Sequence, residues 1–84
     1  MIYFTTRFQK NRTKLPRKVK VQLSERLRLF EDDSSHPLLN NHALGGEYEG
    51  CRSINVTGNY RAIYYEQSGI YFFLRVGTHP ELYG

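Results

Sequence analysis

The sequence predicts a single α+β domain over residues 1–84, in which an N-terminal strand and a helical hairpin precede an antiparallel β-meander. Two patterns predict this order. Apolar residues recur at steps of three and four between residues 19 and 30, which is the period of a helix face. After about residue 46 the period changes to two, which is that of strands. We expect one twisted antiparallel sheet with the two helices on one face and the other face open.

The chain begins with a short strand and a first helix. Residues 1–5, MIYFT, have strand composition and alternate, so that Ile2 and Phe4 share one face. Thr5 or Thr6 can cap a helix that begins near Arg7, because a threonine hydroxyl accepts a hydrogen bond from a free N–H group at a helix start.

A proline separates the two helices. Because the residue before Pro16 disfavours helical dihedrals, the first helix should end there. Pro16 suits the first turn of a second helix, which we expect to run to about Glu31. The apolar stripe of this second helix consists of Val19, Leu23, Leu27 and Phe30.

The second half of the chain has the pattern of turns and strands. Residues 32–46 have turn composition, with room for a short turn at 37–39. The segment EYEGCRSINV predicts two short strands or one bulged strand, with Gly50 at the irregularity. The turns TGN and SG then introduce two longer strands, YRAIYYEQ and IYFFLRVG. Core positions are expected at Leu44, Ile54, Ile63, Phe73 and Leu74.

Composition excludes several classes of protein. No apolar run is long enough to span a membrane and none near Met1 is typical of a signal peptide, so we expect a cytoplasmic protein without a membrane partner. Cys51 is the only cysteine, which prevents an internal disulfide and fits a reducing compartment. Cys51 and the three histidines are not spaced like a zinc-finger site. We expect neither a metal nor a cofactor.

Positive charge is concentrated in the first third of the chain. Up to Arg28 there are nine lysines and arginines against one acid, Glu25, which gives a net charge of +8. Such a segment is typical of a surface that binds a polyanion such as nucleic acid. A solvated helix face has the same pattern, so charge alone leaves both interpretations open. The residues that we single out are Lys14, Arg17, Lys18 and Lys20.

Three motifs follow one another in the second half of the chain. They are H-x-L-x-G-x-aromatic-x-G-x-R at residues 42–52, aromatic-Arg-x-Ile-Tyr at 60–64, and G-T-H-x-x-L-aromatic at 77–83. In this order and spacing they resemble the RelE/ParE toxin superfamily, and within it the YafQ branch of bacterial mRNA interferases. The helical half is similar only in its basic character and its order of elements.

The resemblance implies a toxin of a type II toxin–antitoxin pair. Such a toxin cuts mRNA on the ribosome by metal-independent attack of the RNA 2′-OH, and a cognate antitoxin protein holds it inactive. The basic helical residues would then contact ribosomal RNA. One alternative is a ParE-like inhibitor of DNA gyrase, against which the G-T-H-x-x-L-Y motif counts. Another is a non-catalytic module that binds RNA or protein through the basic helices.

The residue types themselves suit a metal-free ribonuclease. RNA carries its own nucleophile, so the protein must supply a base for the 2′-OH, an acid for the leaving 5′-oxygen and cations for the phosphate. Histidine suits proton transfer near neutral pH, arginine binds two phosphate oxygens, and aromatic rings stack on unpaired bases. The candidates are His79 and His42 for proton transfer, Arg61 and Arg52 for phosphate, and Tyr60 and Tyr83 for stacking, with a hydrogen bond from Tyr83 as a second role.

The two histidines and Arg61 each have a structural alternative. Without its motif His79 would be a turn residue at a strand end, and His42 an exposed loop residue. Arg61 should point to the face opposite Ala62, where it could instead pair with a glutamate. The motifs favour catalysis for His79 and phosphate binding for Arg61, and leave the role of His42 open. We expect the last strand to deliver His79 and Tyr83 to the rim of the face that carries Arg61.

Two residues depart from the YafQ pattern. Asn55 stands where that branch has a histidine, and Asn59 stands where it has an aspartate before the aromatic–arginine step. Amides orient a substrate through hydrogen bonds but do not titrate. We therefore expect both to bind substrate. The general base is then His42, or it is weak or supplied by the ribosome, or activity is reduced.

Overall fold

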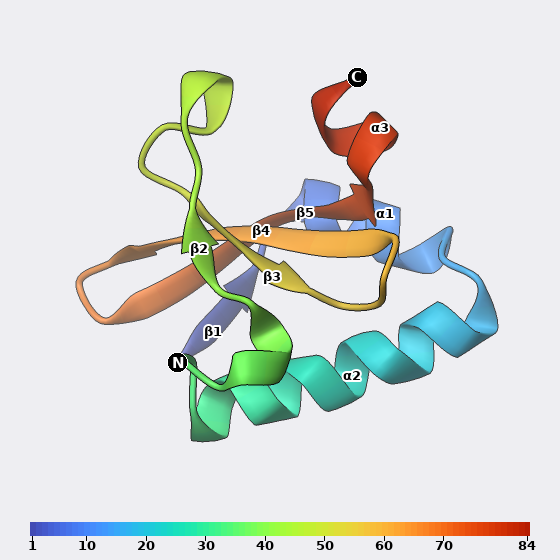
Figure 1. Cartoon of the computed structure of the whole chain (residues 1–84), viewed down its shortest axis with the longest axis horizontal. Coiled ribbons are helices and arrows are strands. Elements are labelled where there is room, and N and C mark those ends of the chain that lie inside the picture. The colour runs from blue at the N-terminus through green and yellow to red at the C-terminus, as the bar shows by residue number, and fades with distance from the viewer.

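The computed structural model describes all 84 residues, Met1–Gly84, and has an α+β fold built on one five-stranded sheet (Figure 1). The strands lie in the order β1-β5-β4-β3-β2. No helix combines the length and the apolar character that crossing a membrane requires. In chain order the elements are β1 (Ile2–Phe4), α1 (Thr6–Thr13), α2 (Arg17–Asp32), the 3₁₀ turn η1 (Pro37–Leu39), β2 (His42–Ala43), the 3₁₀ turn η2 (Gly46–Tyr48), β3 (Arg52–Asn55), β4 (Tyr60–Gln67), β5 (Ile70–Thr78) and α3 (His79–Tyr83).

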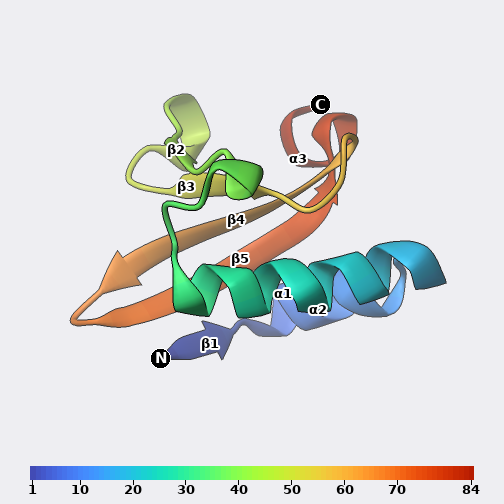
Figure 2. The same ribbon diagram turned by 60° about the horizontal axis from the view of Figure 1, so that its bottom comes forward.

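The predicted order of a strand, two helices and a meander is confirmed. Thr5 caps α1, because its side chain accepts a hydrogen bond from the Phe8 N–H. The connection between α1 and α2 ends at Pro16, and α2 begins at the next residue, Arg17. All four residues of the predicted α2 stripe are buried. Both helices lie on the same side of the sheet (Figure 2).

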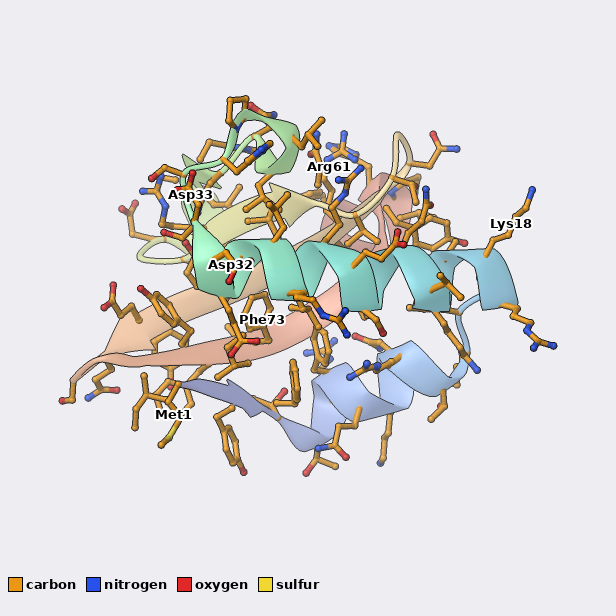
Figure 3. The ribbon with its side chains drawn as sticks, turned by 90° about the horizontal axis from the view of Figure 1, so that it is seen from below. Met1, Lys18, Asp32, Asp33, Arg61 and Phe73 are labelled. Atoms are coloured by element: carbon orange, nitrogen blue, oxygen red, sulfur yellow. The ribbon has the colours of Figure 1, made fainter.

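The core fills the space between these helices and the sheet. Phe73, on β5, is fully buried beneath α2 (Figure 3). Its ring lies 5.7 Å from that of Phe8, 5.3 Å from Phe30 and 5.1 Å from Tyr64, between ring centroids. Of the five expected core positions in the second half, Leu44 and Leu74 are only half-buried, and the others are buried, namely Ile54, Ile63 and Phe73.

The sheet is mixed rather than antiparallel throughout. β1 runs parallel to β5, with Ile2 opposite Tyr71 and Phe4 opposite Phe73. All other neighbouring strands are antiparallel. Alternation in the sequence indicates which residues share a face, but it carries no information on strand direction across a long connection.

β5 runs far beyond its partner β1, and this leaves a gap in the sheet edge. β1 has three residues and β5 has nine, so the outer edge of β5 has no strand after Phe73. Residues of the α1 region replace the missing strand. The Thr5 hydroxyl donates to the Leu74 carbonyl (3.2 Å), and the Asn11 side-chain oxygen accepts from the Val76 N–H (3.2 Å). We call the hollow beside this edge the edge notch.

Three segments differ from the expectation. Residues 42–43, expected to lie within a turn, form the short strand β2 beside β3. Residues 46–48 form η2 rather than a strand, and the following turn uses Gly50 at φ 86°, a conformation that favours glycine. Residues 79–83, for which no regular element was predicted, form α3. The Thr78 hydroxyl accepts from the Glu81 N–H (3.3 Å) and the Glu81 carboxylate accepts from the Thr78 N–H (2.7 Å). This capping box, with Pro80 in the first turn, was present in the sequence T-H-P-E.

η2 and α3 both stand on the face of the sheet opposite α1 and α2 (Figures 1 and 2). This face, which we call the outer face, is therefore not fully open. It is a floor of strands with one wall from the β2–β3 connection and another from α3.

Candidate active site

A cross-strand row on the outer face carries the first site residues. Asn55, Arg61 and Gly77 lie directly opposite one another on β3, β4 and β5, and residues so paired share a face. Ala62, the neighbour of Arg61, is fully buried in the core beneath the helices. Arg61 therefore points away from the helices, to the face expected from its alternation.

A groove of about 430 Å³ opens between the β3–β4 turn and the start of α3. Asn59, Tyr60, Arg61 and His79 line this groove. His79 is the first residue of α3, and its exposed ring lies 4.6 Å from the ring of Tyr83 at a tilt of 46°. The structure thus brings an imidazole, a guanidinium, an amide and a phenol to one end of the sheet.

The guanidinium of Arg61 is held by the backbone of the turn. Its Nη1 donates to the carbonyls of Thr57 (3.0 Å), Gly58 (3.1 Å) and Tyr60 (3.2 Å). These carbonyls, rather than a glutamate, are its partners. Nε and Nη2 make no hydrogen bond within the protein, so one edge of the fork remains available for two oxygens of a phosphate.

A tyrosine from η2 connects to α3 across the outer face. The Tyr48 hydroxyl donates to the Leu82 carbonyl (2.9 Å) and accepts from Nη1 of Arg75 (2.9 Å). Nη2 of Arg75 donates to the Glu81 carbonyl (3.2 Å). The Tyr48 ring also packs edge-on against Tyr83, with centroids 5.5 Å apart. We call these contacts the Tyr48 bridge, and they fix the helix that carries His79.

Sequence reasoning missed both Tyr48 and Arg75. The signal for Arg75 is a lone cation inside the apolar run FFLRVG, and Tyr48 is the aromatic residue of the first motif. The two are 27 residues apart, so no local pattern links them. Their importance follows from the tertiary structure alone.

Three buried polar atoms on the outer face have no hydrogen-bond partner: Oγ of Ser53, Oδ1 of Asn55 and Nε of Arg75. Ser53 and Arg75 both lie opposite Ile63, two residues along the strands from the row of Asn55 and on the same face. Leaving a buried polar group without a partner costs about 1–3 kcal/mol. Such groups mark places where water or ligand atoms complete the hydrogen bonding.

His42 lies on the outer face but outside the groove. It is opposite Ser53 on β2, which is two strands from β4 and therefore roughly 10 Å away at the usual strand spacing. Its Nδ1 is 2.8 Å from the Asn40 carbonyl. Because a carbonyl only accepts, Nδ1 carries the hydrogen in the neutral ring and Nε2 is left as an acceptor.

Arg52 and Tyr60 lie elsewhere than the outer face. Arg52 is opposite Tyr64 on the helix side of the sheet, where its Nε donates to Oδ1 of Asn41 (2.7 Å). A phosphate held by Arg61 is out of its reach, which corrects the expectation that both arginines serve one site. Tyr60 packs against the core on the helix side of the sheet. It also lines both the groove and the edge notch.

The four singled-out cations, Lys14, Arg17, Lys18 and Lys20, are all exposed at the corner where α1 meets α2. Figure 3 shows Lys18 at one end of α2 and Asp32 and Asp33 at the other. The first turn of α2 has no acid and the last turn no base, which is the reverse of the order that a helix dipole favours. The charges of this basic corner are therefore not placed for helix stability.

Two titrating groups are perturbed. Hydrogen bonds from the backbone and the hydroxyl of Thr78 lower the pKa of Glu81. Burial raises the pKa of the Cys51 thiol, which disfavours the thiolate that a nucleophile would need. No three His, Cys, Asp or Glu side chains gather closely enough to hold a metal ion.

Comparison with known proteins gives matches among solved structures only. No protein-family model matches the sequence, and no curated protein matches it at a significant level. YafQ from E. coli strain BL21(DE3) superposes with a TM-score of 0.85 at 22% identity, over 100% of this chain and 98% of that one. A chain of the E. coli DinJ–YafQ toxin–antitoxin complex gives 0.82 at 23% identity, over 100% and 97%. A chain of the Mycobacterium tuberculosis toxin–antitoxin complex RelBE2 gives 0.71 at 28%, over 94% and 96%.

Proposed function

Because the chain has the fold of the RelE/ParE toxins, in the form that YafQ has, we propose that it is the toxin of a toxin–antitoxin pair and cuts mRNA on the ribosome. The observation that carries the proposal is the groove, where His79 and Arg61 meet beside Tyr83. An imidazole, an arginine fork with a free edge and an aromatic ring are the groups that metal-free RNA cleavage requires.

The reaction is a transesterification within the RNA. The 2′-oxygen attacks the adjacent phosphorus, the bond from phosphorus to the 5′-oxygen breaks, and a 2′,3′-cyclic phosphate forms. His79 donates a proton to the leaving 5′-oxygen. Arg61 binds the phosphate oxygens through Nε and Nη2, where negative charge builds in the transition state. Tyr83 stacks on the base beside the cut or orients it with its hydroxyl.

The proton of the 2′-OH needs a separate acceptor. A general base must come within about 3 Å of the proton that it takes, directly or through one water. His42 lies two strands from Arg61 and does not line the groove, so we do not assign it this role. Asn59 lines the groove and Asn55 lies opposite Arg61 on the neighbouring strand, so both can orient the nucleotide by hydrogen bonds. We assign the base to a water in the groove or to a group of the ribosome.

The charge and shape of the surface suggest two macromolecular partners, ribosomal RNA and an antitoxin protein. The basic corner holds the toxin on ribosomal RNA, which would place its action in the cytoplasm. An antitoxin that is acidic in part would fold on this corner or on the outer face and block access to the groove. The similarity to chains of toxin–antitoxin complexes supports such a partner. A structure of the complex in which both surfaces remain bare would contradict this.

The rival function is gyrase inhibition, since fold does not determine activity. A gyrase inhibitor has no use for an imidazole next to a phosphate-binding arginine, so the groove favours cleavage. The deciding experiment is induction of the protein in bacteria followed by primer extension on abundant mRNAs. We expect cuts at defined positions within translated codons. DNA damage signalling without mRNA cuts would instead establish gyrase as the target.

A further inference from the structure

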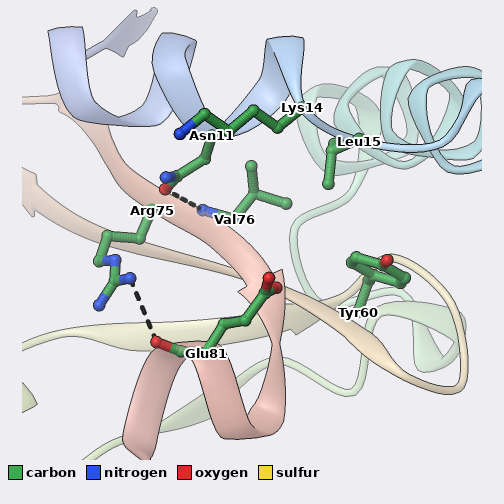
Figure 4. A pocket seen from close by; sticks show the side chains of 7 residues that line it. All are labelled: Asn11, Lys14, Leu15, Tyr60, Arg75, Val76 and Glu81. Atoms are coloured by element: carbon green, nitrogen blue, oxygen red, sulfur yellow. Dashed lines mark hydrogen bonds between the residues drawn. The ribbon is translucent and has the colours of Figure 1, made fainter.

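The edge notch is a second polar hollow, of about 340 Å³, close to the groove (Figure 4). It exists because β1 stops at Phe4 while β5 continues to Thr78. α1 forms one wall and α3 the other, with the edge of β5 between them (Figure 4). A volume of this size falls in the range of small-ligand sites.

The notch presents cations together with an aromatic ring. Lys14 and Arg75 supply the positive charge, and Tyr60 supplies the ring. The ammonium of Lys14 is exposed and makes no hydrogen bond within the protein. The guanidinium of Arg75 is held by Tyr48 and Glu81, so it contributes its charge rather than a free donor. These groups suit a phosphate and a base rather than an apolar ligand.

Two further residues supply hydrogen-bonding groups for a base edge. Oδ1 of Asn11 is occupied by the Val76 N–H, which fixes the amide and leaves its NH₂ group to donate. One carboxylate oxygen of Glu81 accepts from the Thr78 N–H, and the other is left to accept a second hydrogen bond. The notch thus offers a donor and an acceptor that are both held in place by the protein.

Tyr60 is the link between the two hollows, because it lines the groove as well as the notch. An RNA strand whose phosphate lies between Arg61 and His79 therefore has its next nucleotide at the mouth of the notch. We propose that the edge notch binds this neighbouring nucleotide of the RNA, with the base against Tyr60 and the phosphate at Lys14. The inference rests on the proposed ribonuclease function and assigns a second subsite to it.

The test uses a short RNA oligonucleotide with 2′-O-methyl groups, which binds but cannot be cut. Its affinity is measured by fluorescence anisotropy from low to moderate salt for the parent, Lys14→Ala, Tyr60→Leu and Arg28→Ala. Arg28 is an exposed cation of α2 outside the notch, so it is the matched control for loss of one charge. Leucine at position 60 keeps apolar bulk on the core but removes the ring face.

We expect Lys14→Ala to reduce the slope of log affinity against log salt by about 0.7, the value for one single-strand phosphate contact. Tyr60→Leu should weaken binding roughly five- to 150-fold, as loss of one base–aromatic stack does. Arg28→Ala should leave the slope as in the parent. Melting curves of the variants must show that each remains folded.

Three results would overturn the inference. One is equal slopes for Lys14→Ala and Arg28→Ala. Another is absence of RNA binding even at millimolar oligonucleotide. The third is that Lys14→Ala and Tyr60→Leu impair only antitoxin binding, which would make the notch a protein-binding site. Because the oligonucleotide is not cut, these outcomes do not depend on cleavage, and failure of mRNA cleavage would refute the proposed function separately.

Discussion

Replacement of Tyr48 by phenylalanine tests how α3 is held in place. The change keeps the ring that packs on Tyr83 but removes two hydrogen bonds, one to the Leu82 carbonyl and one from the Arg75 guanidinium. A neutral hydrogen bond contributes about 0.5–1.5 kcal/mol and one to a charged group about 1.5–3 kcal/mol. Tyr48 and Arg75 are only half-buried, so water compensates in part. We expect a net loss of about 1–2 kcal/mol in the docking of α3.

That loss has a local consequence. A helix of five residues is not stable alone, so α3 unfolds when it undocks. A loss of about 1–2 kcal/mol raises the open fraction roughly five- to thirtyfold. Amide exchange at Gly84, whose N–H donates to the Pro80 carbonyl, should accelerate by this factor, while the melting temperature changes little. mRNA cleavage should fall by no more than the same factor, because His79 is misplaced only in the open state.

Tyr65→Phe is the matched control for this experiment. Tyr65, on β4, is half-buried like Tyr48, but its hydroxyl makes no hydrogen bond within the protein. Its loss should alter neither exchange nor cleavage. Parental exchange at Gly84 together with parental cleavage in Tyr48→Phe would refute the view that the Tyr48 bridge positions α3.

The remaining predictions concern charge, pH and the groove. Reversal of charge at Lys18 and Lys20 should weaken ribosome binding and reduce cleavage on ribosomes, and binding by the parent should fall steeply with salt; an affinity that is flat from low to moderate salt would contradict this. Because the pKa of Glu81 is lowered in the folded state, its capping contribution is present above its ordinary pKa and is lost as the pH falls through the lowered value. Relative to the intrinsic exchange rate at each pH, the Gly84 amide should therefore lose protection in acid for the parent but not for Glu81→Gln, and identical protection profiles would exclude the capping role. Tyr83→Ala should reduce cleavage more than Tyr83→Phe if stacking dominates, and both should reduce it equally if the hydroxyl matters. His42→Ala should retain most of the cleavage rate, and a loss as large as that of His79→Ala would make His42 the base.

Local patterns in the sequence predicted most of the fold. The α2 stripe and the turn at 68–69 depend on residues close together in the chain, and both lie where they were expected. The direction of β1 depends on the long connection to β5, which alternation does not encode. α3 was predictable from Thr78 and Glu81, because T-x-x-E with an early proline is a helix start.

The candidate site was predictable only in part. The motifs and the alternation of β4 indicated His79 and Arg61, and the structure brings both into one groove. Arg52 was expected to act like Arg61. Ile54 faces the core, and Arg52 lies two residues before it on β3, so Arg52 points to the helix side of the sheet as well. The contact of Tyr48 with Arg75 joins segments that only the tertiary structure brings together.

The most direct test of the central claim is analysis of the RNA ends left by the purified protein on ribosomes programmed with mRNA. The parent protein should leave a 2′,3′-cyclic phosphate upstream and a 5′-hydroxyl downstream of each cut, because the 2′-OH is the nucleophile. His79→Ala should be folded, with a melting temperature near that of the parent. It should cut more slowly by a factor on the order of a hundred or more, as expected for loss of a general acid. A folded His79→Ala protein that cuts at the parental rate, or parental products that carry a 5′-phosphate, would contradict the account.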